Sequence, residues 1–147
     1  GLKVQYPAPS LPTESVSADV LARGKKLAFD GDPQTDVPAC AACHGPKLTG
    51  VKPNVPGLLG LPLDYLNAQL GAWQTGRRHA HTPDCMAQVV KGLSNDDLMA
   101  VTHFLARQAL PSDASPMTAE AWAALPRRPK ADWRCGATLR VNAKGQP

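Results

Sequence analysis

The stretch Cys40-Ala41-Ala42-Cys43-His44 constrains this chain more than any other part of its sequence. Two cysteines three positions apart lie on neighbouring parts of one helical turn, so both thiols can reach the two vinyl groups of one haem and form thioethers. The histidine that follows falls beneath the iron, where its imidazole can supply the proximal nitrogen ligand. These five residues therefore predict a covalently bound haem c, attached through Cys40 and Cys43 and ligated by His44.

A CxxC pair can also belong to a zinc site or to a thioredoxin-like redox motif. A structural zinc site needs two further cysteine or histidine ligands at matching spacing. The chain has no second CxxC or HxxxH pair; its other cysteines and histidines are His79, His81, Cys85, His103 and Cys135. A thioredoxin motif needs a buried strand before it, whereas residues 30–38 are polar and rich in turn formers. The lack of further zinc ligands and the lack of a preceding strand both favour the haem interpretation.

The composition agrees with a small helical domain built around a cofactor. At 147 residues the chain suits one domain with modest extensions, and its single CxxCH predicts a single haem. Aromatic residues make up 5% of the chain and 15 residues are proline, so an apolar cofactor is expected to replace part of an aromatic core. No β pattern competes with the helical periodicity. The predicted fold class is all-α.

Three regions are predicted along the chain. Residues 1–16 are expected to form an extended arm, residues 17–110 the haem domain, and residues 111–147 a Pro-rich, basic extension that wraps the domain. Ser17 is expected to cap a first helix whose apolar face includes Leu27. Because glycine inside a helix costs up to about 1 kcal/mol relative to alanine, Gly24 in this helix predicts the close approach of a second helix.

The remaining helices follow from local start and stop signals. Pro62 is expected to open a Leu-rich helix that Gly76 ends, and Ser94-Asn95-Asp96-Asp97 resembles a capping box for a helix that ends near Gln108. A short helix is expected around residues 118–124. Between the attachment turn and Pro62 lies a long loop, in which Leu58 is expected to point inward to the haem.

Chemistry alone leaves the sixth ligand of the iron open. A thioether is a soft, neutral donor that favours ferrous over ferric iron relative to a second imidazole. Met86, Met99 and Met117 are the thioether candidates. Met99 falls inside a predicted helix, where methionine is more often core filler, and Met117 lies in the extension. His79 and His81, shortly before Met86, are competing ligands.

The order of these features resembles that of class I cytochromes c: an attachment turn, a prolyl loop, a Leu-rich helix, a methionine and a capped last helix. The resemblance covers about residues 17–108. Within the class, three segments are most similar to the bacterial cytochrome c4 and c5 type: PNVPGLLG at 53–60, YLNAQL at 65–70 and MAQVVKGLS at 86–94.

The resemblance implies a small fold of about four to five helices around one haem. Its first and last helices cross, with Gly24 and Phe29 packed against the Phe104 face. It further implies that Pro56 offers its carbonyl to the second ring nitrogen of His44. In this family pattern the distal ligand is Met86.

Two cysteines depart from the family pattern. Cys85 directly precedes the expected ligand, and Cys135 lies in the C-terminal extension. In an oxidising compartment such a leftover pair suggests a disulfide, the alternative being two free thiols or one reactive cysteine. The bridge would close a loop of about fifty residues, stabilise the fold by on the order of 4 kcal/mol, and draw the extension across the Met86 loop.

The predicted function is one-electron transfer by a six-coordinate His/Met haem that cycles between Fe(III) and Fe(II). Electrons are expected to pass through the exposed thioether edge near Cys40 and Cys43. The two extensions favour a cytochrome subunit or electron-acceptor partner of a larger oxidoreductase, such as a dehydrogenase or an oxidase, with no catalysis by this chain alone. The alternative is a haem enzyme or small-ligand sensor whose distal ligand is labile or a histidine.

Location and partners follow from the same features. Haem of this type is attached outside the bacterial cytoplasm, so the chain is expected to be exported to the periplasm; its start at Gly1 is compatible with removal of an export signal. No stretch has the length of a membrane span. The net charge of +4 is mild, which argues against nucleic-acid binding. Arg77 and Arg78 are candidates for steering an acidic partner protein, the alternative being an ordinary solvated face.

Overall fold

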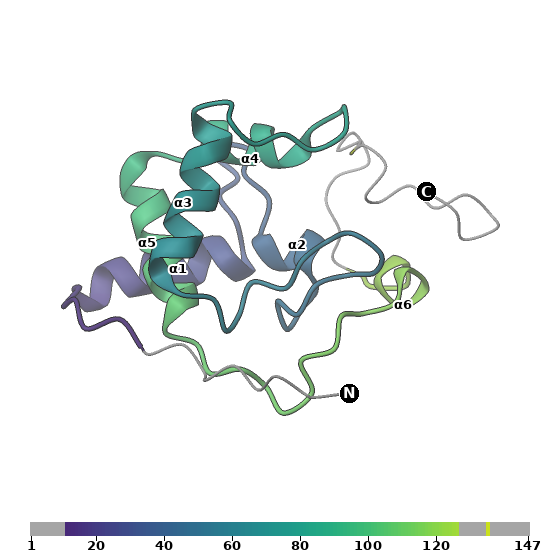
Figure 1. Ribbon diagram of the computed structural model, residues 1–147, viewed down its shortest axis with the longest axis horizontal. Helices are drawn as coiled ribbons and strands as arrows, with labels where there is room; N and C mark the ends of the chain where they lie inside the picture. The colour runs from purple at the N-terminus through teal and green to yellow at the C-terminus, as the bar shows by residue number, and fades with distance from the viewer. Residues whose placement is uncertain (1–10, 127–134, 136–147) are drawn as a thin grey trace, which may run out of the picture.

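The computed structural model describes residues 11–126 and Cys135, and this part of the chain contains helices and no β-strand (Figure 1). The all-α prediction is confirmed, although the described residues hold six helices rather than four or five. Residues 1–10 of the predicted arm, and the extension after Pro126 apart from Cys135, lie outside the described residues. The helices are α1 (Ala18–Phe29), α2 (Cys40–His44), α3 (Leu63–Gln74), α4 (Cys85–Gly92), α5 (Asn95–Ala106) and α6 (Ala119–Ala123).

Polar side chains cap four of the six helices at their first turn. Each cap accepts a hydrogen bond from a backbone N–H that has no partner inside its helix, which stabilises the helix start. Helix α4 is not predicted from the sequence, because its helical pattern of apolar residues spans only eight positions and the stretch before it is polar. The capping residues are Ser17 for α1, Asp84 for α4, Ser94 for α5 and Thr118 for α6.

Helices α1 and α5 cross at Gly24, as the sequence predicts. A Cβ atom on Gly24 would lie 2.2 Å from the carbonyl oxygen of Ala100 and 2.7 Å from Cβ of Phe104. Next to this crossing, the rings of Phe29 and Phe104 meet edge to face with centroids 6.1 Å apart. The absence of a side chain at Gly24 therefore allows two backbones to touch.

The crossing forms the centre of one hydrophobic core. Helix α3 packs on α5, α4 packs on α3, and α2 packs on α1, so both short helices α2 and α4 are attached to the same scaffold (Figure 1). The loop after α2 also contributes, since Leu48 is buried among the helix residues. The buried members of the core are Leu27, Ala28, Leu48, Leu66, Val101, Phe104 and Leu105.

An arginine links three segments at the edge of this core. Arg23 of α1 donates from Nε to Asp97 of α5 at 2.8 Å and from Nη2 to Asp32, in the loop before α2, at 2.7 Å. These hydrogen bonds hold the pKa of both carboxyl groups below the ordinary value of 3.8. The pairs therefore stabilise the fold above that value, and their contribution is lost as the pH falls through the lowered pKa values of the folded state.

We predict that Gly24→Ala destabilises the protein by roughly 1–3 kcal/mol, because the added methyl overlaps a backbone carbonyl that cannot move aside. The matched control is Gly71→Ala in α3, where nothing lies within 4 Å of the added Cβ. This control is expected to gain roughly 0.5–1 kcal/mol from the lost glycine entropy. Urea unfolding of the two holoproteins measures both changes, and equal effects would refute the close crossing.

We also predict that the stabilising effect of Arg23 depends on pH. The difference in unfolding free energy between wild type and Arg23→Met should be largest near neutral pH and shrink below about pH 4, where the two carboxyl groups become protonated. Unfolding midpoints at several pH values test this, with Arg77→Met, at an exposed position, as the control. A difference that stays constant with pH would show that Arg23 acts through packing alone.

Candidate functional site

The attachment turn forms the short helix α2, which places Cys40 and Cys43 on one helical turn. Neither thiol is paired in a disulfide. Burial raises the pKa of Cys40 to about 12 and that of Cys43 to about 11, so both sulfurs stay protonated near neutral pH. Two unpaired, half-buried thiols on one helical turn are the arrangement that attachment to a single haem requires.

His44 is buried and has one ring nitrogen already engaged. Its Nδ1 lies 2.7 Å from the carbonyl oxygen of Pro56. A carbonyl can only accept, so Nδ1 carries the proton and donates, and the lone pair remains on Nε2. Burial lowers the pKa of His44 and keeps the imidazole neutral. The residue thus presents one oriented nitrogen donor, as a proximal haem ligand must.

The loop after α2 brings Pro56 to this position through backbone hydrogen bonds. The N–H of Gly50 donates to the carbonyl of His44 at 2.8 Å, and Val51 and Val55 bond to each other in both directions at 2.9 Å. Gly50 has φ +92, and a Cβ there would lie 2.6 Å from the carbonyl oxygen of Val55. Glycine is therefore needed at this point for the loop to return the Pro56 carbonyl to His44.

Leu58 follows Pro56 at the end of this tight turn. Its N–H donates to the carbonyl of Leu48 at 2.8 Å, and its half-buried side chain packs against the core. Contact between Leu58 and the haem stays a prediction.

Met86 lies in the first turn of α4 and is half-buried. The residue that positions this turn is Asp84, whose carboxylate accepts from Ala87 N–H at 3.0 Å, from Ala80 N–H at 2.8 Å and from the Trp73 indole at 3.2 Å. Desolvation alone would raise the pKa of Asp84, but these hydrogen bonds outweigh it and lower the pKa. One carboxylate thus joins α3, the loop and α4.

Sequence reasoning missed this carboxylate, because its partner Trp73 lies eleven residues away on another helix. The loop is further held by Arg78, whose guanidinium lies 4.1 Å from the centre of the Trp73 ring. Arg78 also donates to Gln69 of α3. Of the two arginines expected to steer a partner, Arg78 is therefore engaged in packing, whereas Arg77 is exposed.

The competing ligand candidates lie in different places. His79 and His81 are exposed on the loop before α4. Met99 is 42% exposed on α5, so the expectation that it fills the core is wrong. Met117 lies on the side of the proximal ligand, because a Cβ on Gly45 would be 3.3 Å from its sulfur. If His44 holds the iron, a sixth ligand would have to come from a residue on the other side of the haem.

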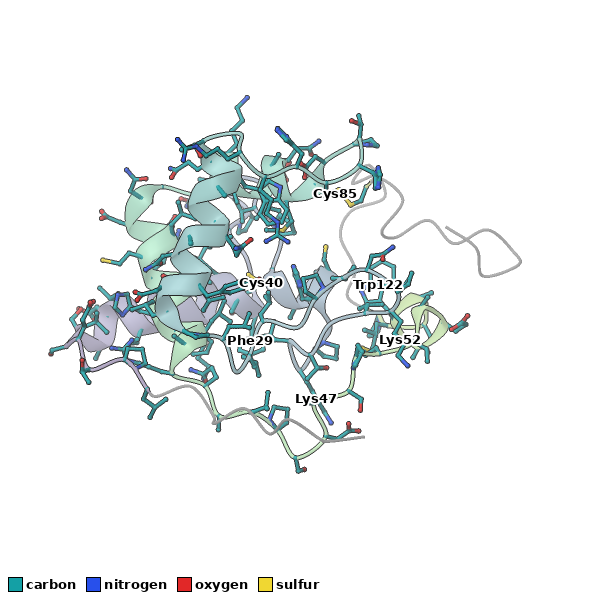
Figure 2. All side chains as sticks on the ribbon, in the orientation of Figure 1. Phe29, Cys40, Lys47, Lys52, Cys85 and Trp122 are labelled. Atoms are coloured by element: carbon teal, nitrogen blue, oxygen red, sulfur yellow. A yellow bond between two sulfur atoms is a disulfide. The ribbon has the colours of Figure 1, made fainter. Side chains whose placement is uncertain are left out.

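The two remaining cysteines form the predicted disulfide. The Cα atoms of Cys85 and Cys135 are 5.2 Å apart, and the bridge joins positions 50 residues apart in sequence. It connects Cys135 to Cys85, which is labelled in Figure 2 and is the first residue of α4 and the neighbour of Met86 in the sequence. The zinc alternative loses two candidate ligands as a result, and no group of three or more His, Cys, Asp or Glu in the described residues could hold a metal ion.

These observations agree with a covalent haem at α2. The turn carries two unpaired thiols, and a buried imidazole with a fixed tautomer leaves one nitrogen free for iron. In the part of the chain that the structure describes, no helix has both the length and the apolar character to cross a membrane.

Comparison with known proteins identifies the class. The cytochrome c family model matches residues 21–109 of this chain. Two curated relatives are thiosulfate dehydrogenase electron acceptors: that of Stutzerimonas stutzeri (strain A1501) is 36% identical over 100 residues, and that of Thiomonas intermedia (strain K12) is 38% identical over 104 residues. The matches cover 68% and 71% of this chain but 46% of each relative, so the chain spans about half the length of these proteins.

Solved structures give the same result. The thiosulfate dehydrogenase TsdBA of Marichromatium purpuratum matches with 41% identity and a TM-score of 0.59, over 67% of this chain and 21% of that one. Cytochrome c4 of Acidithiobacillus ferrooxidans matches with 25% identity and a TM-score of 0.55, over 68% of this chain and 56% of that one. The chain therefore belongs to the cytochrome c family, as a class I c-type cytochrome of the c4 type. It is an electron-transfer protein with haem c attached through Cys40 and Cys43.

Proposed function

We propose that this chain transfers one electron at a time through a single six-coordinate haem c with His44 and Met86 as axial ligands. Residues 17–110 form the haem domain, between the arm of residues 1–16 and the wrapping extension of residues 111–147. The protein works in the bacterial periplasm as the cytochrome subunit, or the electron acceptor, of a larger oxidoreductase. The observation that carries the proposal is the His44–Pro56 hydrogen bond, which leaves one buried imidazole nitrogen free for iron.

The choice of Met86 as the distal ligand is supported by the positions of the three methionines. Met99 is exposed on α5, and Met117 lies beside Gly45 on the side of His44. Met86 is half-buried on α4, in a turn that the Asp84 carboxylate holds in place. It is therefore the thioether best placed to bind the iron from the face opposite His44.

When bound, the haem supplies the Fe(III)/Fe(II) couple. The chain contributes a rigid surrounding, because Pro56 fixes the orientation of His44 and Asp84 fixes the turn that carries Met86. Neither His44 nor Met86 has to move or exchange a proton during electron transfer. The thioether of Met86 favours the ferrous state relative to a second imidazole, which raises the reduction potential.

The partner is proposed from the relatives. Two curated proteins that share more than a third of their matched residues with this chain are electron acceptors of thiosulfate dehydrogenase. We therefore infer that this domain accepts electrons from a dehydrogenase of the same class, acting on thiosulfate or a similar reduced sulfur anion.

The ligation is tested by Met86→Ala. The wild-type ferric protein is expected to show the weak red absorption band of iron–thioether charge transfer, and Met86→Ala is expected to lose it and to show a lower reduction potential. Met99→Ala and Met117→Leu, which change the other two thioethers, should keep the band. Its persistence in Met86→Ala would contradict the assignment.

The partner is tested by reduction of the ferric holoprotein in a stopped-flow spectrometer. Purified thiosulfate dehydrogenase together with thiosulfate is expected to reduce it rapidly, and at low salt faster than at high salt if charged surfaces guide the encounter. The controls are the enzyme without thiosulfate and thiosulfate without the enzyme. Reduction no faster than with thiosulfate alone would rule out this partner and leave the ligation unaffected.

A further inference from the structure

The described part of the C-terminal extension lies on the attachment turn and on the loop after it. Residues 116–125, called here the C-terminal cover, fall outside the region that matches the cytochrome c family. The Met117 N–H donates to the Gly50 carbonyl at 2.9 Å, and the Lys52 N–H donates to the Met117 carbonyl at 2.8 Å. The Met117 sulfur packs over Gly45, the residue after His44. The cover is therefore bonded to the loop that positions the proximal ligand.

Trp122 connects the cover to the attachment turn itself. Its indole N–H donates to the carbonyl of Ala42 at 2.8 Å, across 80 residues of sequence. Ala42 lies between the two attachment cysteines, and Figure 2 shows Trp122 between α2 and α6. The side chain is half-buried, and the Thr118 cap of α6 sets the start of the helix that carries it. The indole is thus placed against the part of α2 that holds the haem.

The sequence explains why this carbonyl needs a partner from elsewhere. In a longer helix the Ala42 carbonyl would accept from the N–H of residue 46, but that residue is Pro46, which has none. The neighbouring carbonyls of His44 and Gly45 accept from Gly50 and Leu48 within the loop. Trp122 supplies a donor in place of the one that Pro46 lacks, so its position is specified by a bond as well as by packing.

We propose that the cover shields the attachment edge of the haem, with Trp122 as the residue that closes it to water and to small redox-active solutes. The proposal rests on the proposed function and departs from the expectation that electrons pass through an open edge near Cys40 and Cys43, both of which are half-buried with the cover in place. Ferric haem carries one more positive charge than ferrous haem, so excluding water from its edge disfavours the ferric state. Trp122 thereby raises the potential and restricts direct exchange with small reagents.

The extension is also held at a second point, beyond the cover. Cys135 is bonded to Cys85 at the start of α4, so the extension is fastened both to the turn that carries His44 and to the helix that carries Met86. A change at Trp122 therefore leaves the extension covalently attached. The effect of the Trp122 indole can therefore be measured separately from the effect of losing the whole extension.

The test compares Trp122→Ala with wild-type holoprotein in two measurements. Oxidation of the ferrous protein by ferricyanide, followed by stopped flow, is expected to be several-fold faster in the variant. Its reduction potential, from spectroelectrochemical titration, is expected to be lower. Trp122→Phe keeps an aromatic ring but cannot donate to Ala42, and should change both quantities in the same direction by less. Ala123→Ser, at an exposed position of α6, is the matched control and should change neither.

Three outcomes would overturn the proposal. A wild-type rate and potential in Trp122→Ala would show that the edge is not shielded by the indole. A slower reaction would show that Trp122 conducts electrons instead of blocking access. Loss of the iron–thioether band in Trp122→Ala would assign the residue to the support of the distal ligand. The ligation itself is checked separately, because the iron–thioether band should be present in wild type and absent in Met86→Ala. If that holds, a negative result with Trp122→Ala counts against the shielding proposal alone.

Discussion

The hydrogen bond between His44 and Pro56 is the interaction on which the site depends. It couples the attachment turn to a loop that has little regular structure of its own, and it determines which imidazole nitrogen is free. The loop in turn is held by the Gly50–His44 backbone bond and by Leu48, which is buried with the helices. A ligand on a five-residue helix would otherwise be poorly oriented, because so short a helix has few internal hydrogen bonds.

The proposed distal side is held by a different set of interactions. Met86 lies on a short helix that packs on α3, and its position follows from the Asp84 carboxylate, which receives donors from the loop, from α4 and from Trp73. The two sides of the proposed haem site are thus organised by separate local networks on one core. The extension then joins them, through Trp122 on one side and Cys135 on the other. This arrangement distinguishes the chain from a minimal carrier domain.

Much of the fold could be predicted because its signals are local. The helix starts at Ser17 and Ser94, the helix-opening Pro62 and the mid-helix Gly24 each act through neighbours along the chain or through a missing side chain. The Cys85–Cys135 pairing was also accessible, since only two cysteines remain after the attachment motif. Helix α4 was missed because its start depends on Asp84, whose other donors come from the preceding loop and from α3. Burial of Met99 was predicted from helical context alone, and the side chain faces solvent instead.

The sequence by itself determined the cofactor, because the covalent attachment site of haem c and its predicted proximal ligand lie within five consecutive residues. It also determined that residue 46, a proline, cannot donate to the Ala42 carbonyl. Only the tertiary structure decided which distant side chains bond to these local groups. Arg23 meets Asp97 across 74 residues, and Trp122 meets Ala42 across 80. Such pairs depend on how the helices and the extension pack, and no local pattern specifies that packing.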